Sequence, residues 1–222
     1  MIKYLTFDVY GTLFDWYGTL YEILKKEVQD PSNFLKEWRD LQLKLTMINT
    51  MLGKEHRSFD EITKISLVYT LKKYKLKVKE EELLLAWRNL KTFNDVNSNL
   101  KILSKKYEIA LLSNGDLESL KLLAKKLPIK ISSIISAEDS KAYKPSPKIY
   151  EKALEVLKAK KEEILHVSSH QMDVWGAKNF GLKCVWINRY NEPYLEGIEI
   201  YDYVVKDFNE LSNLLKFTVK EA

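Results

Sequence analysis

The sequence predicts an α/β fold: a Rossmann-like, doubly wound parallel sheet with an inserted all-helical domain. Three observations predict this fold. A short apolar run near the N-terminus ends in an aspartate, a long segment of helical periodicity follows, and strand-like runs then alternate with amphipathic segments. Such alternation is typical of a parallel sheet with helices on both faces. In these sheets, ligands bind at the carboxyl ends of the strands.

The first element is a buried strand at residues 2–7 (IKYLTF), which ends at Asp8. A turn containing Gly11 and Thr12 follows it directly. The place of Asp8, after a buried strand and before a Gly-Thr turn, favours a functional carboxylate over an ordinary turn or capping residue.

The second segment, from about residue 16 to residue 90, has helical periodicity throughout and lacks strand signals. It predicts an insert of three to four helices. We therefore assign residues 1–14 and 93–222 to the α/β core domain and residues 15–92 to a helical domain.

The rest of the chain alternates between strands and helices. The expected strands are residues 108–114, 164–169, 183–188 and a short one at 202–207, and residues 129–136 are expected to form a strand or an extended run. The expected helices are residues 117–127, 146–159, 172–180 and 208–217. Polar residues follow several of these strands, so we expect them to converge at one edge of the sheet.

The composition, 45% hydrophobic and 30% charged, is that of a globular protein. The N-terminus lacks the residue order of a signal peptide, so we expect a cytoplasmic location. The net charge is +5, but the lysines recur with glutamates at helical spacing, which indicates solvated helix faces. We therefore expect neither a nucleic-acid nor a membrane partner. The one cysteine, Cys184, lies in an apolar run and is interpreted as a buried thiol.

Four short motifs occur in order, each at the end of an expected strand or just before an expected helix. They are FDVYGTLFD (7–15), LLSNG (111–115), YKPSPKIY (143–150) and HVSSHQMDVWGAKNFGL (166–182). In this order they resemble the four motifs of the haloacid dehalogenase superfamily. The resemblance covers the whole chain and implies that the helical insert is the cap domain of that family.

At two positions, this chain resembles the dehalogenases of this superfamily rather than its phosphatases. The phosphatases carry a second acid two residues after the nucleophile, where this chain has Tyr10, and tend to carry another at the position of Ser169. Losing both acids removes the proton donor for an alkoxide and weakens a magnesium site, whereas a halide leaves without a proton. WRDLQLKLT (38–46) also resembles the WRxxQLxxT signature of L-2-haloacid dehalogenases.

The resemblance implies hydrolysis of short (S)-2-haloalkanoic acids to (R)-2-hydroxy acids, with no metal and no cofactor. Asp8 would attack C2 of the substrate and form an ester. Thr12 would hydrogen-bond near Asp8, and Lys144 would neutralise its charge. Arg39 would receive the departing halide.

The remaining implied roles concern the substrate and the water. Ser113 and Asn114 would help to bind the substrate carboxylate, and Ser168 and Asp173 would position and activate the water that hydrolyses the ester. The other implied site residues line or support the pocket: Tyr10, Leu43, Phe59, Tyr150, His170 and Met172.

Three residues depart from the family pattern. His170 and Met172 stand where the best-known members have Asn and, two residues on, Trp. The charge of a histidine varies near neutral pH, and a methionine gives a more adaptable pocket wall. Asp40 places an acid directly after Arg39, and an ion pair between them would lower halide affinity.

Several of these residues also have an ordinary structural explanation. Ser113 and Asn114 could cap the next helix, and Arg39 could form a surface ion pair. Asp173 could be a first-turn helix acid. Tyr150 and Phe59 are of a type more often found in cores. We also expect His166 to be a buried, hydrogen-bonded core residue and His56 to be exposed.

Two other functions remain open at this stage. One is a phosphatase of the same fold that acts on a small phosphate ester. The other is a catalytically idle protein that keeps the fold, although the complete set of motif residues argues against it. Relatives of this type commonly dimerise, so a homodimer is a further possibility.

Overall fold

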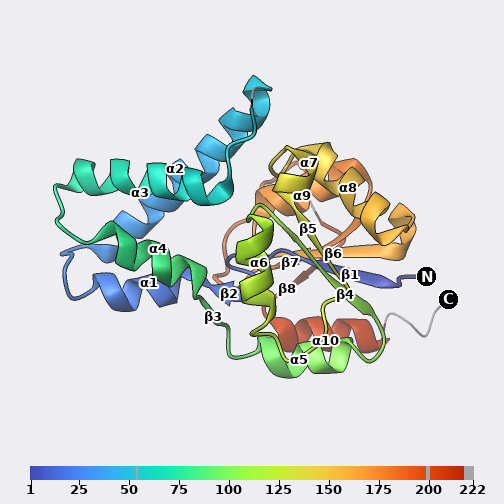
Figure 1. The fold of residues 1–222 in the computed structure, drawn as a ribbon. Helices are drawn as coiled ribbons and strands as arrows, with labels where there is room; N and C mark the ends of the chain where they lie inside the picture. The colour runs from blue at the N-terminus through green and yellow to red at the C-terminus, as the bar shows by residue number, and fades with distance from the viewer. Residues whose placement is uncertain (54, 199–200, 218–222) are drawn as a thin grey trace.

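The computed structural model describes residues 1–53, 55–198 and 201–217. Its centre is a six-stranded parallel sheet with the strand order β5-β4-β1-β6-β7-β8 (Figure 1). The strands are β1 (Tyr4–Phe7), β4 (Glu108–Ser113), β5 (Ser133–Ser136), β6 (Ile164–Ser168), β7 (Lys183–Ile187) and β8 (Tyr203–Val205). The doubly wound α/β fold predicted from the sequence is confirmed.

Helices cover both faces of this sheet, with α5 and α10 together on one face and α8 and α9 on the other (Figure 1). The core helices are α5 (Val96–Leu103), α6 (Leu117–Ala124), α7 (Ala137–Ser140), α8 (Pro147–Leu157), α9 (Gln171–Phe180) and α10 (Phe208–Phe217), with a 3-10 turn at Lys161–Glu163. Helices α5 and α7 and the 3-10 turn were not predicted from the sequence. These segments are too short for a helical period to stand out from the flanking residues.

The strand register brings the chain's polar loops to one edge of the sheet. Phe7, the last residue of β1, pairs with Leu111 of β4 and with Val167 of β6. The backbone N–H of Asp8 then donates to the Val167 carbonyl at 3.0 Å, which fixes the direction of the chain as it leaves β1. Asp8 and the loops after β4 and β6 therefore meet at the carboxyl ends of the three central strands.

Of residues 129–136, expected as a strand or an extended run, only Ser133–Ser136 forms a strand alongside β4. It lies at the edge of the sheet and has a single neighbour, so its length is set by that one pairing.

The inserted segment is helical, as predicted, and forms the left-hand part of the molecule in Figure 1. Its helices are α1 (Trp16–Leu24), α2 (Pro31–Leu52), α3 (Phe59–Tyr74) and α4 (Glu80–Arg88). The first three begin where a side chain accepts a hydrogen bond from the backbone three residues on: Asp15, Asp30 and Ser58. Within the described residues, none of the helices is both long and apolar enough to cross a membrane.

Two short antiparallel strands, which the sequence analysis did not predict, join the helical segment to the sheet. They are β2 (Phe14–Asp15) and β3 (Lys91–Thr92). We propose that this pair is the connection between two domains, because it lies at the boundaries assigned from the sequence. Two-residue strands show no alternation of polar and apolar side chains, so the sequence pattern does not reveal them.

Three residues singled out in the sequence have clear positions. Cys184 is fully buried, as predicted, and burial raises the pKa of its thiol. His166 is also fully buried and hydrogen-bonded, as predicted. The expectation that His56 is exposed is wrong: its ring is half-buried and stacks on Tyr143 with 4.9 Å between ring centroids.

Candidate active site

Asp8 is the centre of the candidate site. This residue lies directly after β1, and its side chain is 12% exposed. Lys144 Nζ lies 3.1 Å from Oδ1, and the Thr12 hydroxyl donates to Oδ2 at 2.9 Å. Gly11 has a positive φ of 89°, which lets the chain turn back so that Thr12 faces Asp8. One oxygen of Asp8 therefore meets a cation and the other a neutral donor.

Lys144 joins two carboxylates. Its ammonium group lies 2.7 Å from Asp173 Oδ2 as well as 3.1 Å from Asp8, and its side chain is only 5% exposed. Burial by itself would lower the pKa of Lys144, but the charges of Asp173 and Asp8 outweigh burial and raise it. Lys144 is therefore cationic at neutral pH and lies between two carboxylates.

Asp173, in the first turn of α9, is held by three side chains. Lys144 and His166 both contact Oδ2, the latter from Nε2 at 3.0 Å, and the Tyr150 hydroxyl donates to Oδ1 at 2.9 Å. Burial disfavours the ionised form, but the Lys144 charge and the His166 contact outweigh it and hold the pKa of Asp173 well below its usual range. Asp173 is thus an ionised anchor and not an ordinary surface acid at a helix start.

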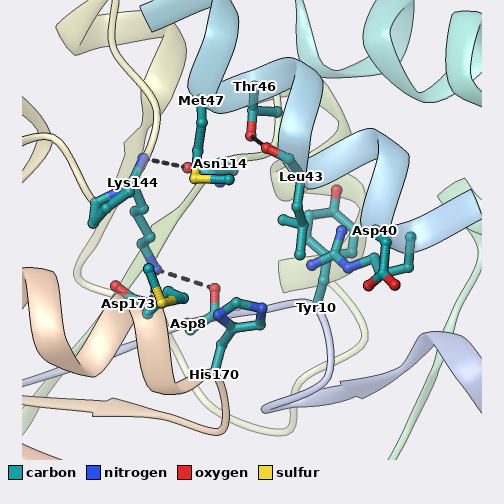
Figure 2. A pocket seen from close by; sticks show the side chains of 13 residues that line it. Asp8, Tyr10, Asp40, Leu43, Thr46, Met47, Asn114, Lys144, His170 and Asp173 are labelled. Atoms are coloured by element: carbon teal, nitrogen blue, oxygen red, sulfur yellow. Dashed lines mark hydrogen bonds and ion pairs between the residues drawn. The ribbon is translucent and has the colours of Figure 1, made fainter. Parts of the chain in front are cut away.

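These groups open onto a cavity of about 250 Å³ between the sheet edge and α2 (Figure 2). Most of the residues that the sequence analysis placed on the pocket wall do line it, and Asn114, Lys144, His170 and Asp173 face the cavity in Figure 2. The complete lining is Asp8, Tyr10, Arg39, Asp40, Leu43, Thr46, Met47, Asn114, Lys144, Pro145, His170, Met172 and Asp173.

Arg39 reaches the cavity from α2. Its guanidinium group lies 5.6 Å from the ring centroids of both Trp16 and Trp87 and donates to Gln42, rather than to the neighbouring Asp40. Burial lowers the pKa of Arg39 to about 10, so it remains a cation at neutral pH. The alternative that Arg39 forms an ordinary surface ion pair is wrong, and its guanidinium is available to an anion.

His170 also lines the cavity. Burial, and then the nearby charge of Arg39, lower its pKa from the usual value. The expected change of charge near neutral pH is therefore displaced to lower pH, and the imidazole is neutral at pH 7.

The two serines of the implied site lie behind the cavity wall. Ser113 and Ser168 are fully buried, and their hydroxyls accept hydrogen bonds from the backbone N–H groups of Gly115 and His170. They shape the loops after β4 and β6. Asn114 does reach the cavity, and its Oδ1 accepts from the backbone N–H of Lys144 at 2.8 Å.

The suggestion that Ser113 and Asn114 cap the next helix is wrong. That helix, α6, begins at Leu117, and the residue at its cap position is Asp116.

The aromatic residues of the implied site divide into two groups. Tyr10 lines the cavity, and burial raises its pKa well above the usual value. Phe59 and Tyr150 are fully buried behind the wall: Phe59 packs on Tyr10 with 5.4 Å between ring centroids, and Tyr150 holds Asp173. Phe59 and Tyr150 are core residues that support the site, as their residue types suggested.

Four residues of the site were not predicted as site residues from the sequence. Thr46 and Met47 lie seven and eight positions after Arg39, and this spacing puts them on the same face of α2. Pro145 lines the cavity beside Lys144. His166 was predicted only as a core histidine. The sequence feature that could have marked it as a site residue is its place, as a polar residue, in the middle of an apolar strand.

The arrangement combines a buried carboxylate, a paired ammonium group and a guanidinium around one small cavity. Such a site can bind an anion and place a carboxylate oxygen against an electrophilic carbon. In the described part of the chain, no cluster of three or more His, Cys, Asp or Glu side chains is arranged to hold a metal ion.

Comparisons with known proteins agree with this geometry. Residues 2–181 match the family model for haloacid dehalogenase-like hydrolases. The chain is 32% identical to (S)-2-haloacid dehalogenase 2 of Pseudomonas sp. (strain CBS-3), with 97% of this chain and 96% of the relative covered. It is 31% identical to (S)-2-haloacid dehalogenase 4A of Burkholderia cepacia, with 100% and 98% covered.

A solved structure is also similar to this chain. The L-2-haloacid dehalogenase of Xanthobacter autotrophicus with chloropropionic acid covalently bound superposes with a TM-score of 0.88 at 26% identity, covering 98% of this chain and 99% of the other. The fold, the site and the sequence matches agree over nearly the whole chain, which therefore belongs to the haloacid dehalogenase-like hydrolase family.

Proposed function

We propose that this chain hydrolyses the carbon–halogen bond of short (S)-2-haloalkanoic acids and releases (R)-2-hydroxy acids. The observation that carries the proposal is the position of Asp8. Its carboxylate, held by Lys144 and Thr12, opens onto a cavity whose wall also carries the Arg39 cation. The names of the relatives, which are (S)-2-haloacid dehalogenases, support the same reaction for this chain.

In the first step, an oxygen of Asp8 attacks C2 of the substrate. A bond forms between that oxygen and C2, the carbon–halogen bond breaks, and the halide leaves with the bonding electrons. Attack opposite the halogen inverts C2. Asn114, in the loop ordered by Ser113, contacts the substrate carboxylate, and Arg39 receives the halide because its guanidinium is cationic and partly desolvated.

In the second step, water hydrolyses the ester. The water oxygen bonds to the carboxyl carbon of Asp8, and the bond breaks between that carbon and the oxygen that links it to C2. One proton of the water goes to the hydroxyl of the product and the other leaves to solvent. Asp173, fixed by Lys144, His166 and Tyr150, orients the water together with the loop shaped by Ser168. The second step does not touch C2, so the product keeps the inverted configuration.

The state of Tyr10 supports a halide leaving group over a phosphate ester. Tyr10 stands where a phosphatase would need a proton donor, two residues after Asp8. Because burial raises its pKa well above the usual value, it gives up its proton less readily than an exposed phenol. A halide needs no proton, so this environment does not impede its departure.

We also propose that the protein is a cytoplasmic homodimer. The exposed apolar side chains Ile48, Met51 and Leu52 lie at the end of α2, which projects from the molecule in Figure 1, and they support a contact between two copies. Light scattering of the purified protein measures the mass directly. A monomer at every concentration would exclude the dimer.

The test of the reaction is halide release from L- and D-2-chloropropionate in the presence of EDTA. We expect release from the L form only, with no loss in EDTA. Asp8→Asn, which keeps the side chain's shape and removes its charge, should abolish release. No halide from either form would exclude the proposal for these substrates, and magnesium-dependent release of phosphate from small esters would then favour a phosphatase.

A single turnover in ¹⁸O-labelled water tests the ester mechanism separately. The first product molecule takes its hydroxyl oxygen from Asp8, so it should be unlabelled, while mass spectrometry should find the label in the peptide that contains Asp8. Label in the first product would mean that water attacks C2 directly.

A further inference from the structure

A second and larger cavity adjoins the first. It has a volume of about 670 Å³ and lies between α1 and α2 on one side and the loops after β6 and β7 on the other. We call it the annex. The two cavities share six wall residues: Tyr10, Arg39, Asp40, Leu43, His170 and Met172. The annex is therefore continuous with the space in front of Asp8.

The two cavities differ in what they can hold. A short 2-haloacid has only a few heavy atoms and fits in about 250 Å³. The annex, at about 670 Å³, falls within the range of roughly 300–1,000 Å³ that is typical of pockets for larger ligands. Short substrates leave it empty, so its size points to a substrate with an additional group.

Aromatic rings give the annex its chemical character. Trp16 and Tyr17 of α1, Phe93 after β3 and Tyr190 after β7 all lie on its wall. Flat apolar groups pack well against such rings, in stacked or edge-on arrangements. An aliphatic chain would also be accommodated, but the aromatic wall favours a ring.

The charged groups of the annex do not favour a charged ligand. Arg189 pairs with Asp95 at 2.9 Å and lies 4.0 Å over the Phe93 ring, and Asp15 accepts from the backbone at the start of α1. The remaining charges of the wall, apart from Arg39, belong to exposed and solvated side chains: Lys36, Asp40 and Glu192. An uncharged substituent therefore fits this wall better than a second acid.

We propose that the annex binds an uncharged aromatic substituent carried by C3 of the substrate, so that the substrate class extends to 2-halo-3-arylpropionates. This inference rests on the proposed function. In this arrangement, the halogen and the carboxylate occupy the cavity in front of Asp8, and the aryl group extends past the shared wall, which includes Leu43 and Met172, into the annex.

The test compares (S)-2-bromo-3-phenylpropionate with (S)-2-bromopropionate. We expect kcat/KM for the phenyl substrate to equal or exceed that for the short one. Ser32 is an exposed residue of the annex wall in the first turn of α2, so Ser32→Trp can fill the annex at little cost to the fold. It should lower kcat/KM for the phenyl substrate about tenfold or more and change that for 2-bromopropionate less than about twofold.

Ser32→Ala is the matched control, because it removes the same hydroxyl and leaves the annex open. It should lower kcat/KM for the phenyl substrate far less than Ser32→Trp does. In the wild type, a kcat/KM for the phenyl substrate far below that for 2-bromopropionate would overturn the inference and leave the proposed function intact. Equal losses for both substrates in Ser32→Trp would also overturn it, because the annex would then be an entrance.

Binding of acids without a halogen separates this inference from the reaction. Calorimetry should find tighter binding of 3-phenylpropionate than of propionate, and Ser32→Trp should remove the difference. If neither bromo acid releases halide, the proposed function fails, and this binding result alone decides whether the annex takes an aryl group. Equal binding of the two acids would overturn the inference.

Discussion

At the scale of single residues, the central feature of the site is the set of contacts that holds Asp173. Lys144, His166 and Tyr150 all contact its carboxylate, and His166 contacts Thr6 Oγ1 through its other ring nitrogen at 2.9 Å. This buried chain of contacts runs from the sheet interior to the site. In these contacts, Asp173 is the one cavity-lining residue that His166 touches. We therefore regard His166 as a positioning residue.

Removing the imidazole of His166 should affect the second step more than the first. His166→Phe keeps the bulk of the ring and deletes the contact with Asp173, so the water is held less accurately. We expect ester hydrolysis to slow about tenfold, which corresponds to about 1.4 kcal/mol in the barrier. Intact-protein mass spectrometry during turnover should then show the ester on Asp8 accumulating.

His166→Gln, which retains a side-chain donor, is the control and should recover much of the lost rate. Equal slowing of both steps, with no ester detected, would instead mean that His166 supports only the fold.

Acid should destabilise the protein through Asp173. Its pKa in the folded state lies well below the value of about 3.9 typical of an unfolded chain. The unfolded state therefore binds a proton first as the pH falls. The stabilisation is complete above about pH 5 and is lost progressively as the pH falls below about 4 toward the folded-state pKa. Urea unfolding followed by Trp fluorescence should show a smaller loss between pH 7 and pH 3 in Asp173→Asn than in the wild type.

Parallel stability curves for the two proteins would contradict the ionised, anchored state of Asp173. The comparison uses the slope of the free energy of unfolding against pH and not its absolute value. The reason is that the Asn variant also leaves Lys144 with one anionic partner fewer.

At the scale of elements, one helix start joins the helical segment to the core. The backbone N–H groups of Phe59 and Asp60, in the first turn of α3, each donate to the carboxylate of Asp116 at 2.8 Å. Ser119 of α6 also donates to Asp60 at 3.1 Å. A core carboxylate at the positive end of α3 therefore fixes the position of that helix relative to the core.

Asp116→Ala should loosen this contact. We expect the free energy of unfolding to fall by about 1 kcal/mol, as for other lost helix caps, and KM for 2-chloropropionate to rise. The rise is expected because α3 packs beside α2, which carries Arg39 and Leu43. Urea unfolding and steady-state kinetics measure the two effects.

Ser58→Ala is the matched variant, since Ser58 caps the same helix through Glu61 N–H at 3.1 Å without involving the core. It should lose similar stability and keep its KM. A similar rise of KM in both variants would show that helix stability, not the contact with the core, sets substrate binding.

At the scale of the whole molecule, the site lies between the sheet and the helical segment, which contribute different groups. The sheet edge supplies Asp8, Lys144 and Asp173, and α2 supplies Arg39 and Leu43. The paired strands β2 and β3 bring the two ends of the helical segment together, and Phe93 N–H donates to the Leu13 carbonyl at 3.1 Å. The chemistry therefore depends on the position of the helical segment over the sheet.

If residues 15–92 form a separate domain, a short Gly-Ser linker should be able to replace them. We expect the shortened protein to unfold cooperatively, because the sheet keeps its own buried strands and helices. It should release no halide, since Arg39 and Leu43 are gone. Circular dichroism measures the unfolding, and a chain that never folds would contradict the two-domain division.

The sequence by itself determined the doubly wound sheet, the helical insert and the place of Asp8 at the end of the first strand. These features follow from local patterns, namely runs of apolar residues, helical spacing and a Gly-Thr turn, which act within about ten residues of chain. Local patterns of this kind can therefore be recognised in the sequence before any tertiary contact is known.

Only the tertiary structure decided which partners these residues have. It placed Ser113 and Ser168 behind the cavity wall, turned Arg39 toward two tryptophan rings instead of Asp40, and brought His166 against Asp173. It also opened the annex between α1 and the loop after β7. The physical reason is that hydrogen bonds, burial and cavity shape depend on groups from distant parts of the chain, and their mutual distances are set only when the sheet and helices pack.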